Sequence, residues 1–184
     1  MGTSSKPPPA GDPSREKRRL EAQCPTLVGK PYRVTSPSSK AYNCLAWANC
    51  DWHRYWSPQP NYYWPLGLLR EDTTRVEVLE DYFRAQGFQP CDSVARDPSV
   101  EKVAIFGDAR GANHVARRPA NGDWLSKMGD GADIEHAELD WVECGLYGSV
   151  RAVMCRRAHE GERQAPRPAV RLILNPPYRP VALG

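Results

Sequence analysis

The sequence predicts an α+β fold in which N-terminal helices pack on one side of an antiparallel β-sheet. Two helical signals come first, a short apolar run near Tyr42 and an amphipathic stretch over residues 72–86. Short strand signals then follow one another with turn residues between them, which is typical of an antiparallel meander. A chain of 184 residues is long enough for one domain with a core of its own.

The first helix is expected to begin near Tyr42 and to end before Pro58. The run Tyr42–Ala48 is apolar on nearly all sides, so this helix should be buried. Residues 52–66 hold six aromatic side chains and three prolines and predict an aromatic loop. Such a loop either packs over the domain or forms a wall of a substrate cleft.

The second helix, over residues 72–86, is the clearest in the sequence. Asp72 or Thr73 can cap its N-terminus, and Gly87 is expected to stop it. Its apolar side chains recur at helical spacing and form one face, made of Val76, Leu79, Tyr82 and Phe83.

Four strands are expected after this helix. They span residues 102–106, 114–118, 123–128 and 149–156. The pair Asn121-Gly122 favours a two-residue hairpin turn between the second and the third of them. A further edge strand is expected at residues 170–174.

The chain divides into a disordered tail at residues 1–23, a domain at 24–157 and an extension rich in proline and arginine at 158–184. Within the domain, residues 24–40 are expected to form an extended entry loop. The basic excess lies in the two ends, whereas residues 24–150 are mildly acidic, which argues against a nucleic-acid enzyme. The basic ends are either solvated tails or a contact with an acidic partner.

No apolar run approaches the roughly 20 residues that a membrane helix needs, so no membrane contact is expected. The N-terminus lacks the apolar segment of a Sec signal peptide. The predicted location is therefore the cytoplasm, unless a dedicated secretion system exports the chain. Cytoplasmic thiols stay reduced, and the six cysteines contain no Cys-x-x-Cys pair, which argues against a zinc ribbon. No cofactor is expected.

Cys44 and His114 are the candidate catalytic pair. A cysteine becomes a useful nucleophile when its surroundings stabilise the thiolate. Cys44 is predicted in the first turn of its helix, where backbone N–H groups favour negative charge. His114 opens a strand of the sheet on which that helix should pack, so it is expected to reach Cys44 in space as a general base. A third polar group normally holds such an imidazole in its productive tautomer.

This order of cysteine on a helix, histidine on a strand and polar residue on the next strand resembles the NlpC/P60 and CHAP branch of papain-like cysteine peptidases and amidases. Residues 114–117, His-Val-Ala-Arg, and 121–124, Asn-Gly-Asp-Trp, are similar to the histidine strand and hairpin of those enzymes. The resemblance implies a papain-like fold and a thiol hydrolase that cleaves a peptide or protein amide through an acyl-enzyme. Asn43 and Leu45 flank Cys44, where those enzymes usually have aspartate and serine or glycine.

Two residues compete for the third catalytic position. Ser126 lies twelve residues after His114, at about the place of the third polar residue in the NlpC/P60 pattern. A serine can accept the imidazole N–H but carries no charge, so it would orient His114 without strongly stabilising an imidazolium. His136 is the competing residue. Weaker alternatives are Asp123, Lys127 and Asn113.

Residues 42–155 also resemble a bacterial family without an established activity. Its motifs are Tyr-Asn-Cys-[Ile/Leu]-Ala-Trp-Ala, Trp-Pro, His-Val-Ala-Arg and Trp-x-Ser-Lys-x-Gly, which stand here at residues 42–48, 64–65, 114–117 and 124–129. The residues of these motifs that we expect to contact a substrate are Tyr42, Asn43, Trp47, Trp64 and Trp124. An oxyanion hole is also required, with the Cys44 N–H as one donor and either Asn43 or the Tyr42 hydroxyl as a second.

Two further hypotheses remain beside the hydrolase. In one, the protein is a noncatalytic binding module on a papain-like scaffold, with a protein partner such as a toxin or effector, and Cys44 is a small buried residue in a filled site. In the other, Cys44, His114 and His136 bind zinc. The hydrolase instead requires the thiol and the imidazole to lie close together.

Overall fold

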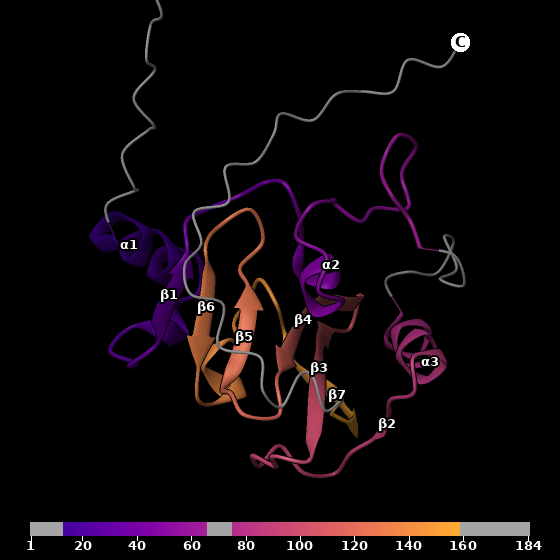
Figure 1. Ribbon diagram of the computed structural model, residues 1–184. Helices are drawn as coiled ribbons and strands as arrows, with labels where there is room; N and C mark the ends of the chain where they lie inside the picture. The colour runs from indigo at the N-terminus through magenta and orange to yellow at the C-terminus, as the bar shows by residue number, and fades with distance from the viewer. Residues whose placement is uncertain (1–12, 66–74, 159–184) are drawn as a thin grey trace, which may run out of the picture.

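The computed structural model describes residues 13–65 and 75–158. Within these residues the fold is α+β, with one antiparallel sheet of seven strands in the order β1-β6-β5-β4-β3-β7-β2 (Figure 1). The strands are β1 (Arg33–Ser36), β2 (Gln89–Pro90), β3 (Val100–Asp108), β4 (Gly111–Arg118), β5 (Trp124–Lys127), β6 (Asp133–His136) and β7 (Ser149–Arg157). The helices are α1 (Pro13–Gln23), α2 (Cys44–Ala48) and α3 (Val76–Ala85), with the short 3-10 helices η1 (Pro25–Leu27) and η2 (Leu139–Trp141).

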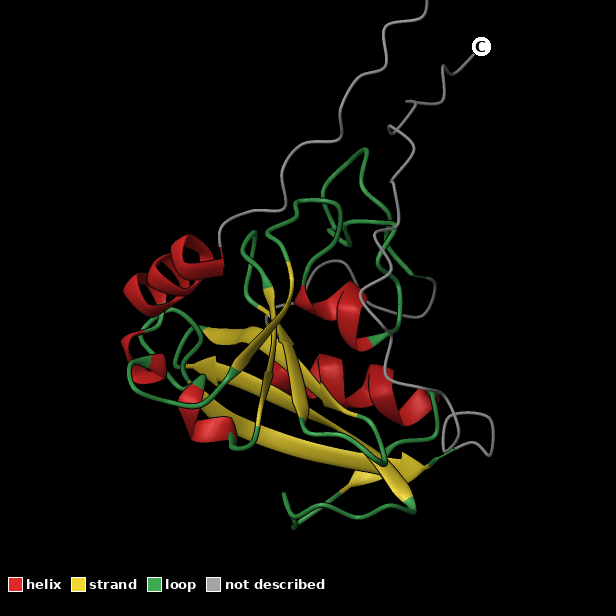
Figure 2. Ribbon diagram, turned by 60° about the vertical axis from the view of Figure 1, so that its left-hand side comes forward, coloured by secondary structure: helices red, strands yellow, loops and turns green. Residues whose placement is uncertain are grey.

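Two hydrophobic cores lie on opposite faces of this sheet. Ala104 and Phe106 of β3 belong to the first core, whereas the alternating Val103 and Ile105 belong to the second. The first core is closed by α1, η1 and η2, and the second by α2 and α3 (Figure 2). Helices therefore cover both faces: the two predicted helices, α2 and α3, lie on one side as expected, whereas α1, which was not predicted, lies on the other.

The elements with the strongest sequence signals are present. The aromatic run begins a helix at Cys44, and β3, β4, β5 and β7 coincide with the four predicted strands to within a few residues. Helix α3 ends as predicted, because Gly87 follows its C-cap with φ +87°, a conformation that glycine adopts at little cost. The predicted caps Asp72 and Thr73 and the predicted strand at 170–174 lie outside the described residues.

Helix α1 occupies residues that the sequence analysis assigned to a disordered tail. The helix is strongly charged, but its Leu20 is fully buried in the first core. A single buried leucine is too sparse a pattern to predict a helix from the sequence, because this helix is stabilised by packing on the rest of the domain.

Strands β1 and β6 were not predicted, and they pair with each other through Val34 and Ile134. Residues of β6 are buried on both of its faces, so the strand lacks the alternation that marks a half-exposed strand. Strand β1 begins within the predicted entry loop. The pair matters because β6 carries His136.

The connection between β4 and β5 is longer than the two-residue turn that Asn121-Gly122 predicted. It runs over residues 119–123, and the Gly122 N–H donates to the Pro119 carbonyl (3.1 Å). Pro119 ends β4 because it has no N–H for the ladder and a fixed φ.

At its other end β4 loses contact with β5. The two strands pair at Ala116 with Ser126 and at Arg117 with Leu125, whereas His114 and Val115 pair only with β3 on the opposite side. The edge of β4 that would face β5 is therefore open at these two residues. Helix α2 packs against β4 and β5 beside this gap. Among the described residues, no helix is long and apolar enough to cross a bilayer.

Candidate active site

His114 is held between two aromatic rings on the first-core side of β4. Its ring centroid lies 5.3 Å from that of Phe106 and 4.6 Å from that of Tyr147, and the residue is 2% exposed. Burial, and the neighbouring His136, lower the pKa of His114 to about 3. The imidazole is therefore neutral throughout the physiological pH range.

A chain of buried hydrogen bonds begins at this imidazole. His114 Nε2 lies 3.1 Å from Ser126 Oγ, which lies 2.9 Å from His136 Nε2. His136 Nδ1 lies 2.8 Å from the Glu138 carbonyl oxygen. The two residues that competed for the third catalytic position thus lie in series, with the serine between the two histidines.

The carbonyl at the end of the chain determines the direction of every hydrogen bond in it. A carbonyl oxygen only accepts, so His136 carries its proton on Nδ1. Burial lowers the pKa of His136 to about 4, so the ring is neutral and its Nε2 accepts from the Ser126 hydroxyl. Ser126 has only one proton to donate, and its oxygen must therefore accept from His114 Nε2–H.

This assignment leaves His114 Nδ1 as a bare acceptor. The atom is buried and has no hydrogen-bond partner among the described residues. Buried polar atoms are nearly always paired, and an exception requires an explanation. A neutral imidazole whose free lone pair is held in place is the form that a general base requires.

Cys44 is the first residue of α2, which begins there because Asn43 caps it. The Asn43 side-chain oxygen accepts from the Ala46 N–H (3.1 Å). Part of Cys44 remains exposed to solvent. Burial nevertheless raises the pKa of the thiol, and the N–H groups of Val115 and Leu45 act in the opposite direction. The sulfur therefore lies within reach of the Val115 N–H.

The Cys44 thiol lies beside the backbone of β4 at the gap between β4 and β5. The Val115 N–H belongs to the peptide bond that follows His114, and no residue of β5 pairs with it there. Helix α2 approaches from the second-core side, whereas the His114 ring lies on the first-core side. No direct hydrogen bond joins Cys44 to His114 in the described structure, and the free Nδ1 is the atom available to form one.

The comparisons with known proteins identify the domain that holds this arrangement. The model of the family described as "Domain of unknown function (DUF7689)" matches residues 33–155. The chain belongs to this family. The match runs from the first residue of β1 into β7 and includes Cys44, His114 and the whole hydrogen-bond chain. No curated protein and no solved structure matches the chain.

A buried lysine of the DUF7689 domain lies on the cysteine side of the sheet. Lys127 is fully buried, its Nζ bonds the Gly131 carbonyl, and it lies 5.0 Å from the centroid of the Tyr42 ring. Its positive charge lowers the pKa of Cys44, against the larger effect of burial. From the sequence, Lys127 was expected only as a weaker alternative for the third catalytic residue. Because neighbours in a strand face opposite sides, Lys127 points away from the side that Ser126 faces.

Several residues expected to contact a substrate make structural contacts instead. The Tyr42 hydroxyl donates to Asp133 (2.6 Å), and the Asn43 amide donates to the Trp56 carbonyl (2.6 Å). Trp124 is 1% exposed within the first core. The Tyr42 hydroxyl is therefore not free for an oxyanion, and one of the two N–H groups of the Asn43 amide is already used.

The other two expected substrate residues, Trp47 and Trp64, are partly buried against the second core. The indole N–H of Trp47 is buried and has no partner within the described part of the chain. Its ring stacks on Tyr42, with centroids 5.8 Å apart. Both tryptophans lie on the face of the sheet that holds Cys44.

The aromatic loop partly packs and partly faces solvent. Trp56 is buried, and its indole N–H donates to Asp51 (2.9 Å). Trp52, Tyr62 and Tyr63 are 40%, 50% and 37% exposed. The loop reaches the candidate site, because the Asn43 amide donates to the Trp56 carbonyl and the Trp52 ring lies 6.2 Å from that of Trp47 in α2. Exposed rings thus lie on the segment that borders the cysteine.

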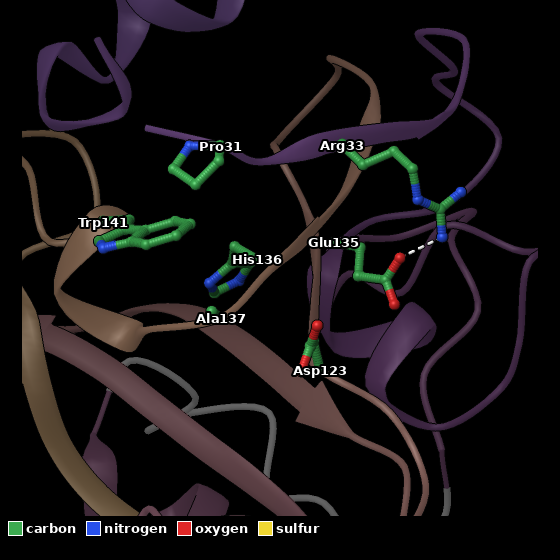
Figure 3. Close-up of a pocket in the computed structure, with 7 residues that line it drawn as sticks. All are labelled: Pro31, Arg33, Asp123, Glu135, His136, Ala137 and Trp141. Atoms are coloured by element: carbon green, nitrogen blue, oxygen red, sulfur yellow. Dashed lines mark hydrogen bonds and ion pairs between the residues drawn. The ribbon is translucent and has the colours of Figure 1, made fainter. Parts of the chain in front are cut away.

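A hollow of about 290 Å³ lies at the far end of the hydrogen-bond chain (Figure 3). His136 and Trp141 form part of its wall, and an ion pair between Arg33 and Glu135 lies at its edge. Cys44 does not line this hollow. The hollow is therefore separate from the Cys44 thiol and from His114.

The zinc hypothesis finds no ligand set in the described part of the chain. No group of three or more histidine, cysteine, aspartate or glutamate side chains there is arranged to hold a metal ion. The Nε2 atoms of His114 and His136 are both engaged in hydrogen bonds with Ser126 Oγ, so neither of them is free to bind a metal ion.

Cys144 is a second thiol whose pKa is shifted. A hydrogen bond with Cys24 lowers the pKa of Cys144 to about 6, and the residue is partly exposed. Cys50 is also exposed, although cysteine is among the residue types most often buried. Any experiment on Cys44 must therefore resolve individual cysteines.

Proposed function

We propose that this DUF7689 protein is a thiol hydrolase, a papain-like (NlpC/P60-like) peptidase or amidase in which Cys44 is the nucleophile and His114 the base. The observation that supports this most strongly is the bare, buried Nδ1 of His114. It lies on the residue before Val115, whose N–H reaches the Cys44 thiol. Nucleophile and base within reach of each other are the minimum that covalent catalysis requires.

The resting pair is neutral. Burial raises the pKa of Cys44 and lowers that of His114, so the proton stays on sulfur until a substrate arrives. As the Sγ–carbon bond forms, the thiol proton moves to His114 Nδ1 and the carbonyl electrons move to oxygen. His114 then gives this proton to the leaving amine or alcohol. A water molecule, deprotonated by the same nitrogen, releases the acyl group from Cys44.

Ser126 and His136 act as positioning residues in this proposal. The chain that ends at the Glu138 carbonyl keeps the proton on His114 Nε2, and this leaves Nδ1 free to accept. The chain carries no negative charge, so it orients the ring more than it stabilises the imidazolium. Lys127 compensates in part for the missing negative charge, because its own positive charge stabilises the Cys44 thiolate.

The chemical class of substrate that fits best is an amide of a peptide or protein. The aromatic loop next to Cys44 exposes Trp52, Tyr62 and Tyr63, and such rings contribute strongly to peptide and protein contacts. Residues 24–150 are mildly acidic overall, which does not favour a nucleic acid.

Residue-resolved acetylation tests this function. The intact protein is treated at pH 7 with p-nitrophenyl acetate, and each cysteine peptide is quantified by mass spectrometry. General-base catalysis contributes about 10²–10⁴-fold, so His114→Gln should slow acetylation of Cys44 by about 100-fold or more. Cys144 is an internal reference, and its rate should not change. Equal Cys44 rates in the two proteins, each shown to be folded, contradict the proposal.

The alternative is a noncatalytic binding module for a protein partner. The exposed aromatic loop and the raised pKa of Cys44 favour it, because a thiol that stays protonated is unreactive. Under this alternative the acetylation of Cys44 is slow and independent of His114, so the same experiment distinguishes the two functions.

A further inference from the structure

Tyr147 contacts the ring of His114 and lies in the loop between η2 and β7. The loop is held tightly, because the Cys144 carbonyl accepts from the N–H groups of both Tyr147 (3.0 Å) and Gly148 (2.8 Å). Gly148 has φ +75°, and a Cβ at this position would collide with the backbone carbonyl of Gly107. The backbone thus fixes where the Tyr147 ring lies.

The hydroxyl of this tyrosine has no structural use that the described residues reveal. Tyr147 is 4% exposed, and its hydroxyl is buried without a hydrogen-bond partner among them. Buried tyrosine hydroxyls usually find a partner, because an unpaired polar group away from water is unfavourable. Tyr147 stacks on His114, whose Nδ1 is also unpaired, so two orphaned polar atoms occur in adjacent side chains.

The proposed reaction also needs a second donor beside the Cys44 N–H. Attack on a carbonyl creates an oxyanion, which preorganised N–H or O–H groups must stabilise. Tyr42 donates its one hydroxyl proton to Asp133, and Asn43 uses one of its two amide N–H groups on the Trp56 carbonyl. The Tyr147 hydroxyl is buried without a partner among the described residues, and the Tyr147 ring lies 4.6 Å from that of His114, the proposed base of Cys44.

We infer that the Tyr147 hydroxyl is the second oxyanion donor of the site, directed at the carbonyl oxygen that Cys44 attacks. The inference rests on the proposed hydrolase function. In the reaction the Sγ–carbon bond forms, the carbonyl π electrons move to oxygen, and Tyr147 O–H donates a hydrogen bond to that oxygen. The tyrosine keeps its proton throughout. When the tetrahedral intermediate collapses, the carbonyl forms again and the leaving group takes the proton from His114.

The variant Tyr147→Phe removes the hydroxyl and keeps the ring that packs on His114. Two reactions of Cys44 are measured in it by peptide mass spectrometry. Acetylation by p-nitrophenyl acetate passes through an oxyanion, whereas alkylation by iodoacetamide is a direct displacement that forms none. Loss of one oxyanion donor costs about 10²–10³-fold in a well-studied protease, and a smaller, about 10- to 100-fold, decrease in acetylation is expected here. Alkylation should change less than about threefold.

A partly buried tyrosine, Tyr82, provides the control. The Tyr82 hydroxyl donates to Asn49 (3.3 Å) in the second core, away from His114. Tyr82→Phe should leave both reactions of Cys44 unchanged. The free energy of unfolding should stay the same or rise in Tyr147→Phe, because the hydroxyl that is removed had no partner.

Three outcomes overturn the inference. Unchanged acetylation in Tyr147→Phe means that the hydroxyl does not contact the oxyanion. An equal loss of acetylation and alkylation means that Tyr147 only positions the thiol or the imidazole. If acetylation of Cys44 is already independent of His114 in the unmodified protein, the hydrolase proposal fails and this inference fails with it. The first two outcomes leave the hydrolase proposal intact.

Discussion

Replacing Ser126 by alanine removes one oxygen atom from the middle of the hydrogen-bond chain. The residue is fully buried, and its hydroxyl is bonded to both His114 (3.1 Å) and His136 (2.9 Å). No other described side chain is bonded to either Nε2 atom. Ser126→Ala therefore leaves a buried N–H on one ring and a buried lone pair on the other without partners.

The cost follows from these two orphaned atoms. A buried donor or acceptor that loses its partner costs about 1–3 kcal/mol, so Ser126→Ala should lower the free energy of unfolding by about 2–4 kcal/mol. The proton of His114 is then no longer confined to Nε2. When it moves to Nδ1, the base is lost, and acetylation of Cys44 should fall by about 10- to 100-fold.

Urea denaturation and peptide-resolved acetylation measure the two effects. Ser149→Ala is the matched control, since Ser149 is an exposed serine at the start of β7 and its replacement should cost less than about 0.5 kcal/mol. A Ser126→Ala protein that is as stable as the control and acetylates Cys44 at the unmodified rate would refute the role of the chain.

Three more predictions concern charge. Lys127→Met should move the pH profile of Cys44 alkylation to higher pH, because the lysine charge favours the thiolate, and an unchanged profile contradicts this. Glu101→Gln should lower stability in urea by about 1–3 kcal/mol, since the buried carboxylate bonds Arg117 (2.7 Å) and Arg156 (2.5 Å); a loss below 0.5 kcal/mol argues against the network. The folded-state pKa values of His114 and His136, about 3 and about 4, lie below the roughly 6.5 of unfolded histidine. The unfolded chain therefore takes up protons first as pH falls, and stability at pH 5 should be lower than at pH 7 by about 2 kcal/mol per buried histidine.

Much of the fold follows from local signals in the sequence. Helix α3 shows its apolar face and its glycine stop, and β3 and β4 are bounded by turn residues. The elements that local signals miss are stabilised by contacts with residues far away in the sequence. Helix α1 places Leu20 in the first core, and β6 is buried on both faces, with Ile134 in the first core and Asp133 bonded to Tyr42 of the second.

The candidate site was predictable in its members but not in their order. Motifs and spacing predicted Cys44, His114 and Ser126, and His136 was named as the residue that competes with Ser126. The sequence presented Ser126 and His136 as competitors, and only the pairing of β5 with β6 places them in series. Tyr147 was missed because it lies in a loop after β6, with no motif around it, and its ring reaches His114 only through the fold.

The proton position on His114 tests the central claim most directly. Long-range ¹H–¹⁵N correlation spectra of protein labelled at histidine report which ring nitrogen is protonated, and the chain has only four histidines. At pH 7 we expect His114 with a proton on Nε2 and none on Nδ1, and His136 with the opposite pattern. Cys44→Ala should shift the Nδ1 resonance of His114. A proton on His114 Nδ1, or an Nδ1 resonance that does not respond to Cys44→Ala, would contradict the assignment of His114 as the base of Cys44.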